Sequence, residues 1–326
     1  MESLDIVVVA ISFLGFVSFC KNILKFLRWV WVMFLRPPKN LKESYGSWAL
    51  ITGCTDGIGK ALAFELASQG LNLVLVGRNP LKLEATATEI RARNGKNNSQ
   101  SEIKIKTSIV DLAKSSGEEI SRAIEACIEG LDIGIVINNA GLAYPYSKFF
   151  HEIDLELMES IVKVNLEAAT WVARSVIPLM LKKKKGAIVN IGSGSTVSVP
   201  SYPLNTVYAS TKARYIAMLS NCMNLEYKNQ GINVQCQIPL LVATKMTRLK
   251  KPNLLVASPE IYAKASIRWI GYEKLCSPFW SHSVQWFILQ ALPDALLNRF
   301  LFQYYLGLRN KGLKKEALRA KEKCIF

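Results

Sequence analysis

Tyr208 and Lys212 are the two side chains in this sequence whose types and spacing most suggest joint chemistry. They stand four residues apart, so on a helix they share one face, one turn apart. A nearby ammonium favours phenolate over phenol, and Tyr208 could then exchange a proton well below the usual tyrosine pKa of about 10. A tyrosine and a lysine at this spacing can equally lie on a solvated helix face. The rest of the chain has to decide between the two interpretations.

A glycine-rich segment, Thr52–Lys60, predicts a site for phosphate groups. It follows the apolar run Trp48–Ile51 and opens a helical pattern of apolar residues, and a second apolar run, Asn72–Val76, follows at βαβ spacing. Glycines at a strand-to-helix turn let the backbone approach a pyrophosphate, and the helix N-terminus favours the anion. The segment therefore predicts a dinucleotide cofactor. The expected contacts are Gly53, Thr55, Asp56, Gly57, Ile58 and Gly59.

The end of the second apolar run indicates which dinucleotide is bound. It continues into Gly77-Arg78-Asn79, with no carboxylate to hold a free ribose 2′-hydroxyl. An acid there would repel a 2′-phosphate, whereas Arg78 can form charge-assisted hydrogen bonds to one. We expect NADPH and NADP+ rather than the NAD pair.

Further polar motifs follow in a fixed order. They are Val110-Asp111-Leu112, Asn138-Asn139-Ala140-Gly141, Asn165, Ala187–Ser195 and Val234–Thr244. Together with the glycine loop and the Tyr208 helix, they resemble the short-chain dehydrogenase/reductase superfamily across about residues 46–250. More narrowly, Thr55–Lys60, Tyr144-Pro145-Tyr146, Phe149–Glu152, Lys185–Ile191 and Val242–Met246 resemble very-long-chain 3-oxoacyl-CoA reductases, the plant β-ketoacyl-CoA reductases and their paralogues above all.

The resemblance implies a catalytic group of Asn165, Ser193, Tyr208 and Lys212. Tyr208 would protonate a ketone oxygen, and Lys212 would lower the pKa of Tyr208 and hold the nicotinamide ribose. Asn165 would support a water chain to the tyrosine, and Ser193 would orient the carbonyl. Ser195 stays open as the alternative serine, because its distance to Tyr208 along the chain fits the family better.

The resemblance also implies further cofactor contacts. Val242 and Thr244 would meet the nicotinamide carboxamide and Asp111 the adenine, while Asn138 through Gly141, Asn138 and Ala140 among them, would lie on the ribose side. Asparagines also cap helices and close turns, which is the simpler explanation for Asn138 and Asn165 taken alone.

The first 38 residues predict an uncleaved membrane anchor and a stiff linker. Ile6–Cys20 is apolar apart from Ser and Gly, and Trp29–Leu35 is a second apolar run. Fifteen residues fall short of the roughly 20 that span a bilayer, so the anchor is expected to span or to lie deep in the interface. Lysines and arginines follow it, which places the next domain in the cytosol. The resemblance implies the endoplasmic-reticulum membrane.

The rest of the chain predicts an α/β fold, a doubly wound parallel (Rossmann) sheet over residues 39–250. Strands are expected near 48–52, 72–76, 103–109, 133–137, 186–191 and 233–238, with helices between them. Residues 251–326 are expected to form a C-terminal apolar helical cap over the substrate, which also touches the membrane surface and carries a basic tail. An ordinary buried helical cap is the alternative.

Composition excludes several other classes of function. The net charge is +16, yet no nucleic-acid motif accompanies it, so no nucleic-acid partner is expected. The seven cysteines are scattered and fit reduced thiols. Only two histidines, His151 and His282, are present, so no metal site is expected.

Three functions stay open. The first is NADPH-dependent reduction of 3-oxoacyl-CoA to 3-hydroxyacyl-CoA in fatty-acid elongation, by a membrane-bound enzyme. The second is reduction of a hydroxysteroid or sterol ketone, since an apolar cap suits either substrate. The third is a paralogue without 3-oxoacyl-CoA activity, which acts on another ketone or as an interaction subunit of an elongase. Elongase components and a second copy of the chain are the candidate protein partners.

Overall fold

The computed structural model describes residues 2–95, 102–195 and 198–323. Most of the polar stretch between the second and third strands and the last three residues of the basic tail lie outside these ranges. The chain divides into two compact units, one ending at Pro38 and one beginning at Lys39.

The first unit is one long helix. Helix α1 (Glu2–Val30) continues into a π-helical turn, η1 (Trp31–Leu35), and the run Leu4–Leu35 is long and apolar enough to cross a membrane by length and composition. The helix is about twice as long as the apolar stretch Ile6–Cys20, because lysine and arginine are good helix formers and do not interrupt it. It ends at Arg36, whose backbone is extended as expected before a proline.

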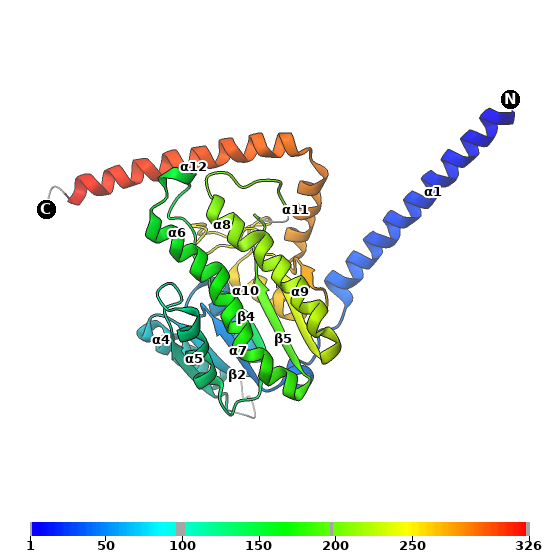
Figure 1. Ribbon diagram of the computed structural model, residues 1–326. Helices are drawn as coiled ribbons and strands as arrows, with labels where there is room; N and C mark the ends of the chain where they lie inside the picture. Colours follow the sequence, from blue (N-terminus) through cyan, green and yellow to red (C-terminus); the bar gives the residue numbers. More distant parts are fainter. Residues whose placement is uncertain (1, 96–101, 196–197, 324–326) are drawn as a thin grey trace. The chain divides into compact units, whose positions relative to one another are not determined.

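A seven-stranded parallel sheet forms the centre of the second unit (Figure 1). The strands are β1 (Trp48–Thr52), β2 (Asn72–Gly77), β3 (Ile105–Ile109), β4 (Ile133–Asn138), β5 (Gly186–Ile191), β6 (Ile232–Gln237) and β7 (Leu275–Cys276). Their order is β3-β2-β1-β4-β5-β6-β7. The six expected strands and the parallel pairing are confirmed. The two-residue β7 was not expected, since so short a run carries no strand pattern of its own.

Helices cover both faces of the sheet because successive strand residues point to opposite sides. On β1, Ala49 and Ile51 enter the core beneath α3 (Gly57–Ser68), α4 (Pro80–Gly95) and α10 (Pro259–Arg268). Leu50 enters the core on the other face. That face is covered by α5 (Gly117–Ile128), α7 (Ala168–Lys183) and α9 (Ile216–Tyr227). The doubly wound Rossmann fold is thereby confirmed.

The strand order reverses between β1 and β4. In an open parallel sheet, the connections leave in opposite directions at such a point, and a crevice opens at the carboxyl ends of the strands. The segments that follow β1, β2, β4, β5 and β6 meet here, and they carry most of the motifs found in the sequence.

Nine further helices and helical turns complete the second unit in the described residues. They are α2 (Leu41–Tyr45), η2 (Phe150–Glu152), α6 (Leu155–Val162), η3 (Lys163–Glu167), α8 (Thr206–Ser210), η4 (Thr211–Tyr215), η5 (Lys228–Gln230), α11 (Trp280–Ala291) and α12 (Asp294–Lys323). Helices α8, η4 and α9 form one continuous run, and so do α6, η3 and α7.

Helix α12 packs on the segments beside α6 and α8 (Figure 1). Leu301 and Tyr305 bury against Leu204, and Arg309 binds Glu152 through two hydrogen bonds. Residues beyond 250 therefore belong to the same compact unit as the sheet. Apolar side chains such as Phe287 and Phe300 stay exposed on α11 and α12.

Candidate active site

A cavity of about 340 Å³ opens at the carboxyl ends of the strands. It brings together residues that lie up to 194 positions apart, from Gly53 to Thr247. The predicted site residues that line it are Gly53, Thr55, Asp56, Gly57, Ile58, Arg78, Asp111, Ala140, Ser193, Tyr208, Lys212, Val242 and Thr244. The size and the mixed lining suit an extended dinucleotide.

The glycine loop has the geometry that such a ligand requires. Gly53 and Gly57 have φ of +66° and +52°, a region that side chains strain. A Cβ on Gly53 would lie 2.8 Å from the Cα of Ala140, and one on Gly59 would lie 2.3 Å from Nδ2 of Asn139. Gly59 does not line the cavity itself and instead lets α3 pack closely against the end of β4. Only glycine fits at these two positions.

Asn139 and Thr52 brace the loop, a role that the sequence patterns did not predict. Nδ2 of Asn139 donates to the carbonyls of Thr52 and Gly53, at 3.1 and 3.0 Å. The Thr52 hydroxyl accepts from the backbone N–H groups of Asn139 and Ala140, both at 3.1 Å. These bonds join the ends of β1 and β4, and no local pattern announces a contact between residues 87 positions apart.

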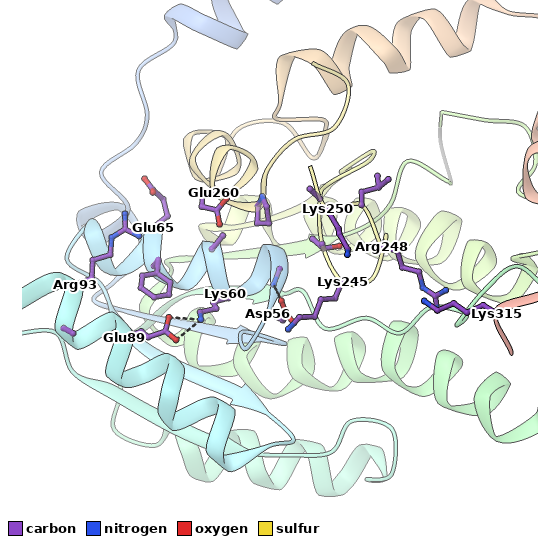
Figure 2. Close-up of a pocket in the computed structure, with 18 residues that line it drawn as sticks. Asp56, Lys60, Glu65, Glu89, Arg93, Lys245, Arg248, Lys250, Glu260 and Lys315 are labelled. Atoms are coloured by element: carbon purple, nitrogen blue, oxygen red, sulfur yellow. Dashed lines mark hydrogen bonds and ion pairs between the residues drawn. The ribbon is translucent and has the colours of Figure 1, made fainter. Parts of the chain in front are cut away.

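A larger cavity of about 1260 Å³ adjoins the first one (Figure 2). The two share Asp56, Gly57, Thr244 and Lys245, so both meet at the N-terminus of α3. The larger cavity extends over α3 and α4, the segment after β6, the start of α10 and one residue of α12.

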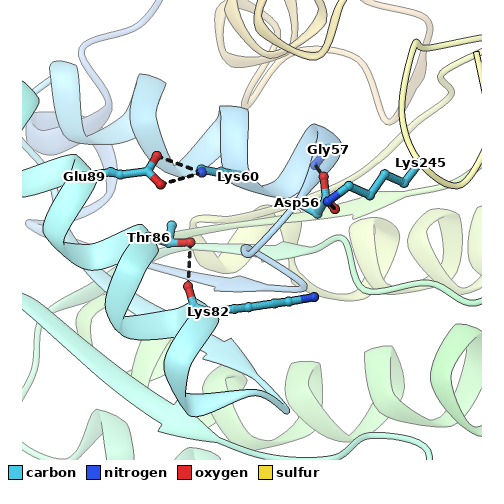
Figure 3. Close-up of polar contacts among 7 residues, drawn as sticks. All are labelled: Asp56, Gly57, Lys60, Lys82, Thr86, Glu89 and Lys245. Carbon is cyan, nitrogen blue, oxygen red and sulfur yellow. Dashed lines mark hydrogen bonds and ion pairs between the residues drawn. The ribbon is translucent and has the colours of Figure 1, made fainter. Parts of the chain in front are cut away.

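Asp56 lines both cavities, and Figure 3 shows its polar contacts. Its carboxylate caps α3 by accepting from the backbone N–H of Gly57 at 2.8 Å, and Lys245 binds it at 2.7 Å. Burial by itself raises the pKa of Asp56, but the hydrogen bonds from Lys245 and Gly57 and the nearby Lys82 ammonium hold that pKa below its usual value. Lys82, in the first turn of α4, is a cation near Asp56 that the sequence patterns did not indicate.

Three polar side chains form a chain that ends at Tyr208. Ser195 donates to the Ser193 hydroxyl from its own hydroxyl at 2.9 Å and from its backbone N–H at 3.2 Å. Ser193 in turn hydrogen-bonds to the phenol oxygen of Tyr208. Ser193 lines the cavity, whereas Ser195 is buried behind it. The geometry places Ser193 beside the tyrosine and gives Ser195 a supporting position.

The prediction that the pKa of Tyr208 is lowered is wrong for the protein without its cofactor. Burial of the phenol raises the pKa of Tyr208, and the hydrogen bond from Ser193 offsets this only in part. Lys212 directs its ammonium to the carbonyl oxygens of Ala140 and Ile191, each at 3.0 Å. Burial lowers the pKa of Lys212 to about 8. A buried phenolate is costly, and the lysine shares its charge with backbone carbonyls.

Asn165 lies behind the cavity and braces its wall. Its Oδ1 accepts from the Leu142 N–H at 2.7 Å, and its Nδ2 donates to the Leu142 carbonyl at 2.9 Å and to the Thr211 hydroxyl at 3.1 Å. Both amide hydrogens are therefore used within the protein. Asn165 ties the segment after β4 to the residue beside Lys212, and the π-helical turn η3 carries it. The Asn165 side chain therefore has no amide hydrogen left to donate to the expected water chain.

Asn138 also points away from the cavity. Its Nδ2 donates to Oδ1 of Asn190 at 2.8 Å and to the carbonyl of Ala169 at 3.2 Å. The structure thus places this asparagine between β4, β5 and α7, where it joins strands, and not on the expected ribose side.

His282 fixes the segment after β6 through both nitrogens of its ring. Its Nδ1 accepts from the Leu240 N–H at 3.3 Å, so its Nε2 donates to the Leu241 carbonyl at 3.0 Å. Burial lowers the pKa of His282 to about 4 and keeps the ring neutral. Across residues 2–95, 102–195 and 198–323, no cluster of three His, Cys, Asp or Glu side chains could hold a metal ion.

Comparisons with known proteins agree with this architecture. The chain is 46% identical over 308 residues to a very-long-chain 3-oxoacyl-CoA reductase-like protein of Arabidopsis thaliana, covering 93% of this chain and 95% of that protein. It is 38% identical to the human inactive hydroxysteroid dehydrogenase-like protein 1, over 86% of this chain and 81% of that one.

A solved structure gives the same fold. A short-chain dehydrogenase from Sphingobium yanoikuyae, in complex with NADPH, matches with a TM-score of 0.62 and 30% identity, over 77% of this chain and 95% of that chain. The family model for short chain dehydrogenases matches residues 47–254. The predicted superfamily is thereby confirmed. The predicted enzyme class, an oxidoreductase that uses NADP, is confirmed as well. The chain is a member of the short-chain dehydrogenase family.

Proposed function

We propose that this protein is a membrane-bound, NADPH-dependent reductase that converts long-chain and very-long-chain 3-oxoacyl-CoA into 3-hydroxyacyl-CoA during fatty-acid elongation. The observation that carries the proposal is the pairing of Tyr208 with Ser193 in the same cavity as Lys212 and the glycine loop. The printed name of the Arabidopsis relative supports the choice of substrate.

The cavity fits NADPH. The positive-φ glycines Gly53 and Gly57 leave room for a pyrophosphate at the N-terminus of α3, and exposed Arg78 stands where a 2′-phosphate would lie. Asp111 would face the adenine, while Val242 and Thr244 would hold the carboxamide. When bound, NADPH supplies the hydride that reduces the ketone carbon.

Tyr208 would donate the proton that completes the reduction. Its raised pKa keeps the phenol protonated at neutral pH, which is the form that a general acid needs. The substrate ketone oxygen would accept hydrogen bonds from Tyr208 and Ser193 and would become the hydroxyl oxygen of the product. Lys212 would hold the nicotinamide ribose and stabilise the phenolate that forms. Solvent returns the proton, and Asn165 keeps the wall in place.

The membrane part of the proposal is supported by the apolar helix Leu4–Leu35. Basic residues follow this helix, which favours a cytosolic second unit at the endoplasmic-reticulum membrane. Protease added to sealed microsomes should digest the unit that begins at Lys39. Full protection of that unit would contradict the orientation, and release by alkaline carbonate would contradict an integral anchor.

The decisive experiment is NADPH oxidation by the purified full-length chain. The substrates are 3-oxoacyl-CoA thioesters of increasing chain length and a panel of steroid ketones. We expect turnover of the long thioesters. Turnover of steroid ketones alone would favour the hydroxysteroid or sterol-ketone alternative.

A second candidate function follows from the human relative, which carries the word inactive in its name. In this alternative the chain binds NADPH but acts as an interaction subunit of an elongase, or pairs with a second copy. The presence of Tyr208, Lys212 and Ser193 in one cavity speaks for catalysis. NADPH binding without reduction of any thioester or steroid ketone would favour the interaction subunit.

A further inference from the structure

We propose that the larger cavity binds the nucleotide end of the acyl-CoA substrate, an adenosine 3′,5′-bisphosphate group, through Arg248, Lys250 and Lys315. We name these three residues the outer cation cluster. The inference rests on the proposed function for its choice of substrate, but none of these three residues lines the smaller cavity that is assigned to the cofactor.

The cavity carries cations that the protein does not neutralise. Lys60 pairs with Glu89 at 2.7 Å, and Lys245 pairs with Asp56, so these two lysines already have partners (Figures 2 and 3). Among the described residues, no carboxylate forms an ion pair with any member of the outer cation cluster. Three unneutralised cations in one concave site attract an anion of several charges.

Two acidic residues of the cavity, Glu65 and Glu260, lie away from Arg248 and Lys315. Figure 2 places Glu65 and Glu260 over α3 and α10, and places Arg248 and Lys315 together at the opposite end. Arginine and lysine side chains of this kind bind phosphate by charge-assisted hydrogen bonds. An anionic ligand is therefore expected at that end.

Lys315 comes from α12, and two contacts define its place. A Cβ on Gly312 would lie 2.4 Å from Cγ of Tyr146, so the glycine lets the aromatic ring approach the helix backbone. The Tyr146 hydroxyl donates to Glu316 at 2.5 Å. These contacts hold the end of α12 and keep Lys315 at the cavity that Arg248 and Lys250 enter from the segment after β6.

The shape favours a soluble nucleotide over a lipid surface. A bilayer is broad and flat, whereas this cavity is concave and measures about 1260 Å³. The cofactor is also an unsuitable occupant, because Arg78 and Asp111, which would hold its adenosine half, line only the smaller cavity. The cavities meet at Lys245, so a thioester held by its nucleotide in the larger one has a route towards Tyr208 in the smaller one.

The test uses the full-length chain in detergent with adenosine 3′,5′-bisphosphate and free CoA as probes, measured by isothermal titration calorimetry. The variant carries Arg248→Gln, Lys250→Gln and Lys315→Gln. A matched control carries Lys182→Gln, Lys184→Gln and Lys185→Gln, which removes three exposed cations elsewhere, including one that shares the positive φ of Arg248. Lys315→Gln alone gives a second, milder variant, and NADPH binding verifies that each protein is folded.

We expect the triple variant to bind both probes about 10- to 100-fold more weakly, since each charge-assisted bond contributes a part of that factor. The control should change little, and NADPH affinity should stay within about twofold in both, because none of the substituted side chains lines the smaller cavity. Failure of the unmodified protein to bind either probe would overturn the proposal. So would an equal loss in the control, or an equal loss of NADPH affinity, which would assign the cavity to the cofactor.

Two further arms separate the sources of phosphate and the two proposals. In the first arm, soluble dihexanoyl phosphatidylserine replaces the nucleotide probes. If the triple variant loses binding of this lipid but keeps binding of the nucleotide probes, the cluster is assigned to lipid headgroups. Turnover of a 3-oxoacyl-CoA is compared with that of the same acyl group on N-acetylcysteamine, which has no nucleotide. The unmodified enzyme should prefer the CoA thioester, and the triple variant should lose most of that preference. If neither thioester is reduced, the proposed function fails, while probe binding still decides the role of the cavity.

Discussion

Lys245 binds the carboxylate of Asp56 at 2.7 Å and so ties the segment after β6 to the N-terminus of α3. The same carboxylate caps the helix through the backbone N–H of Gly57. One acidic side chain therefore forms part of the wall of both cavities and orders the loop beneath the expected pyrophosphate.

The two roles of Asp56 differ in their effect on stability. Asp56→Ala should lower the free energy of unfolding by about 0.5–2 kcal/mol through the lost cap. Lys245→Gln should change it less than Asp56→Ala does, because this ion pair is largely exposed. Denaturant unfolding of the two variants measures both. Equal losses would mean that the ion pair, not the cap, is what stabilises α3.

The Asp56 pKa also gives a direction for the effect of pH. The pKa is lowered in the folded protein, so the stabilising contribution is present above the unfolded pKa of roughly 4 and is lost as the pH falls through the folded value. Asp56→Asn should flatten this acid limb of the stability profile. An unchanged limb would contradict the assignment.

Tyr208→Phe removes one hydroxyl and should reduce turnover by about 10²- to 10⁴-fold, the usual contribution of a general acid. NADPH affinity should stay nearly unchanged, because the ring remains. Tyr227→Phe, on the far part of α9, is the control. Steady-state kinetics and fluorescence titration of NADPH provide the readouts. Retention of most activity by Tyr208→Phe would remove the tyrosine from the mechanism.

Arg78→Asp should reverse the order of cofactor affinities, because a carboxylate accepts the free 2′-hydroxyl of NADH and repels the 2′-phosphate of NADPH. Lys82→Gln should weaken NADPH alone and to a smaller extent, since its ammonium lies near Asp56 at the glycine loop. The dissociation constants of NADPH and NADH for each variant test both expectations. Equal affinities in the unmodified protein would show that Arg78 does not select.

Lys212 should make stability depend on pH in the alkaline range. Its folded pKa of about 8 lies below the unfolded value, so burial of the ammonium costs stability below pH 8, and this cost disappears as the pH rises towards the unfolded pKa. The unfolding free energy of the unmodified protein should therefore rise relative to that of Lys212→Met as the pH increases, by about 3 kcal/mol at most. Denaturant titrations between neutral and alkaline pH test this, and a constant difference would contradict a buried, perturbed lysine.

Helix α12 should loosen when its ion pair is removed. Arg309 binds Glu152 through two hydrogen bonds, and these bonds, with the backbone N–H of Phe149, lower the pKa of Glu152 to about 2. Arg309→Gln should increase hydrogen exchange in α12. The exposed pair of Arg91 and Glu84 supplies the control, Arg91→Gln, which should leave α12 unchanged.

Acid should have the same effect as the Arg309 substitution. The contribution of Glu152 is present above its unfolded pKa and is lost as the pH falls towards about 2. Exchange in α12 that does not respond to either change would show that the apolar contacts of Leu301 and Tyr305 hold the helix by themselves.

The sequence by itself determined the features that short segments encode. The run Trp48–Ile51, the glycines of the loop and the spacing of Tyr208 and Lys212 each carry a local pattern, because strand and helix periods and positive-φ glycines are properties of neighbouring residues. These patterns were enough for six strands, the parallel sheet, the phosphate loop and the family. The long apolar N-terminal helix was also visible, although its true length was not.

Only the tertiary structure decided which side chains meet. It placed Ser193 against Tyr208 and Ser195 behind it, turned Asn138 and Asn165 into braces, and directed Lys212 to two backbone carbonyls. It also brought Lys315 from α12 to the cavity of Arg248. Contacts between residues many positions apart, and the pKa shifts that burial causes, depend on how the layers pack, and no local pattern records that packing.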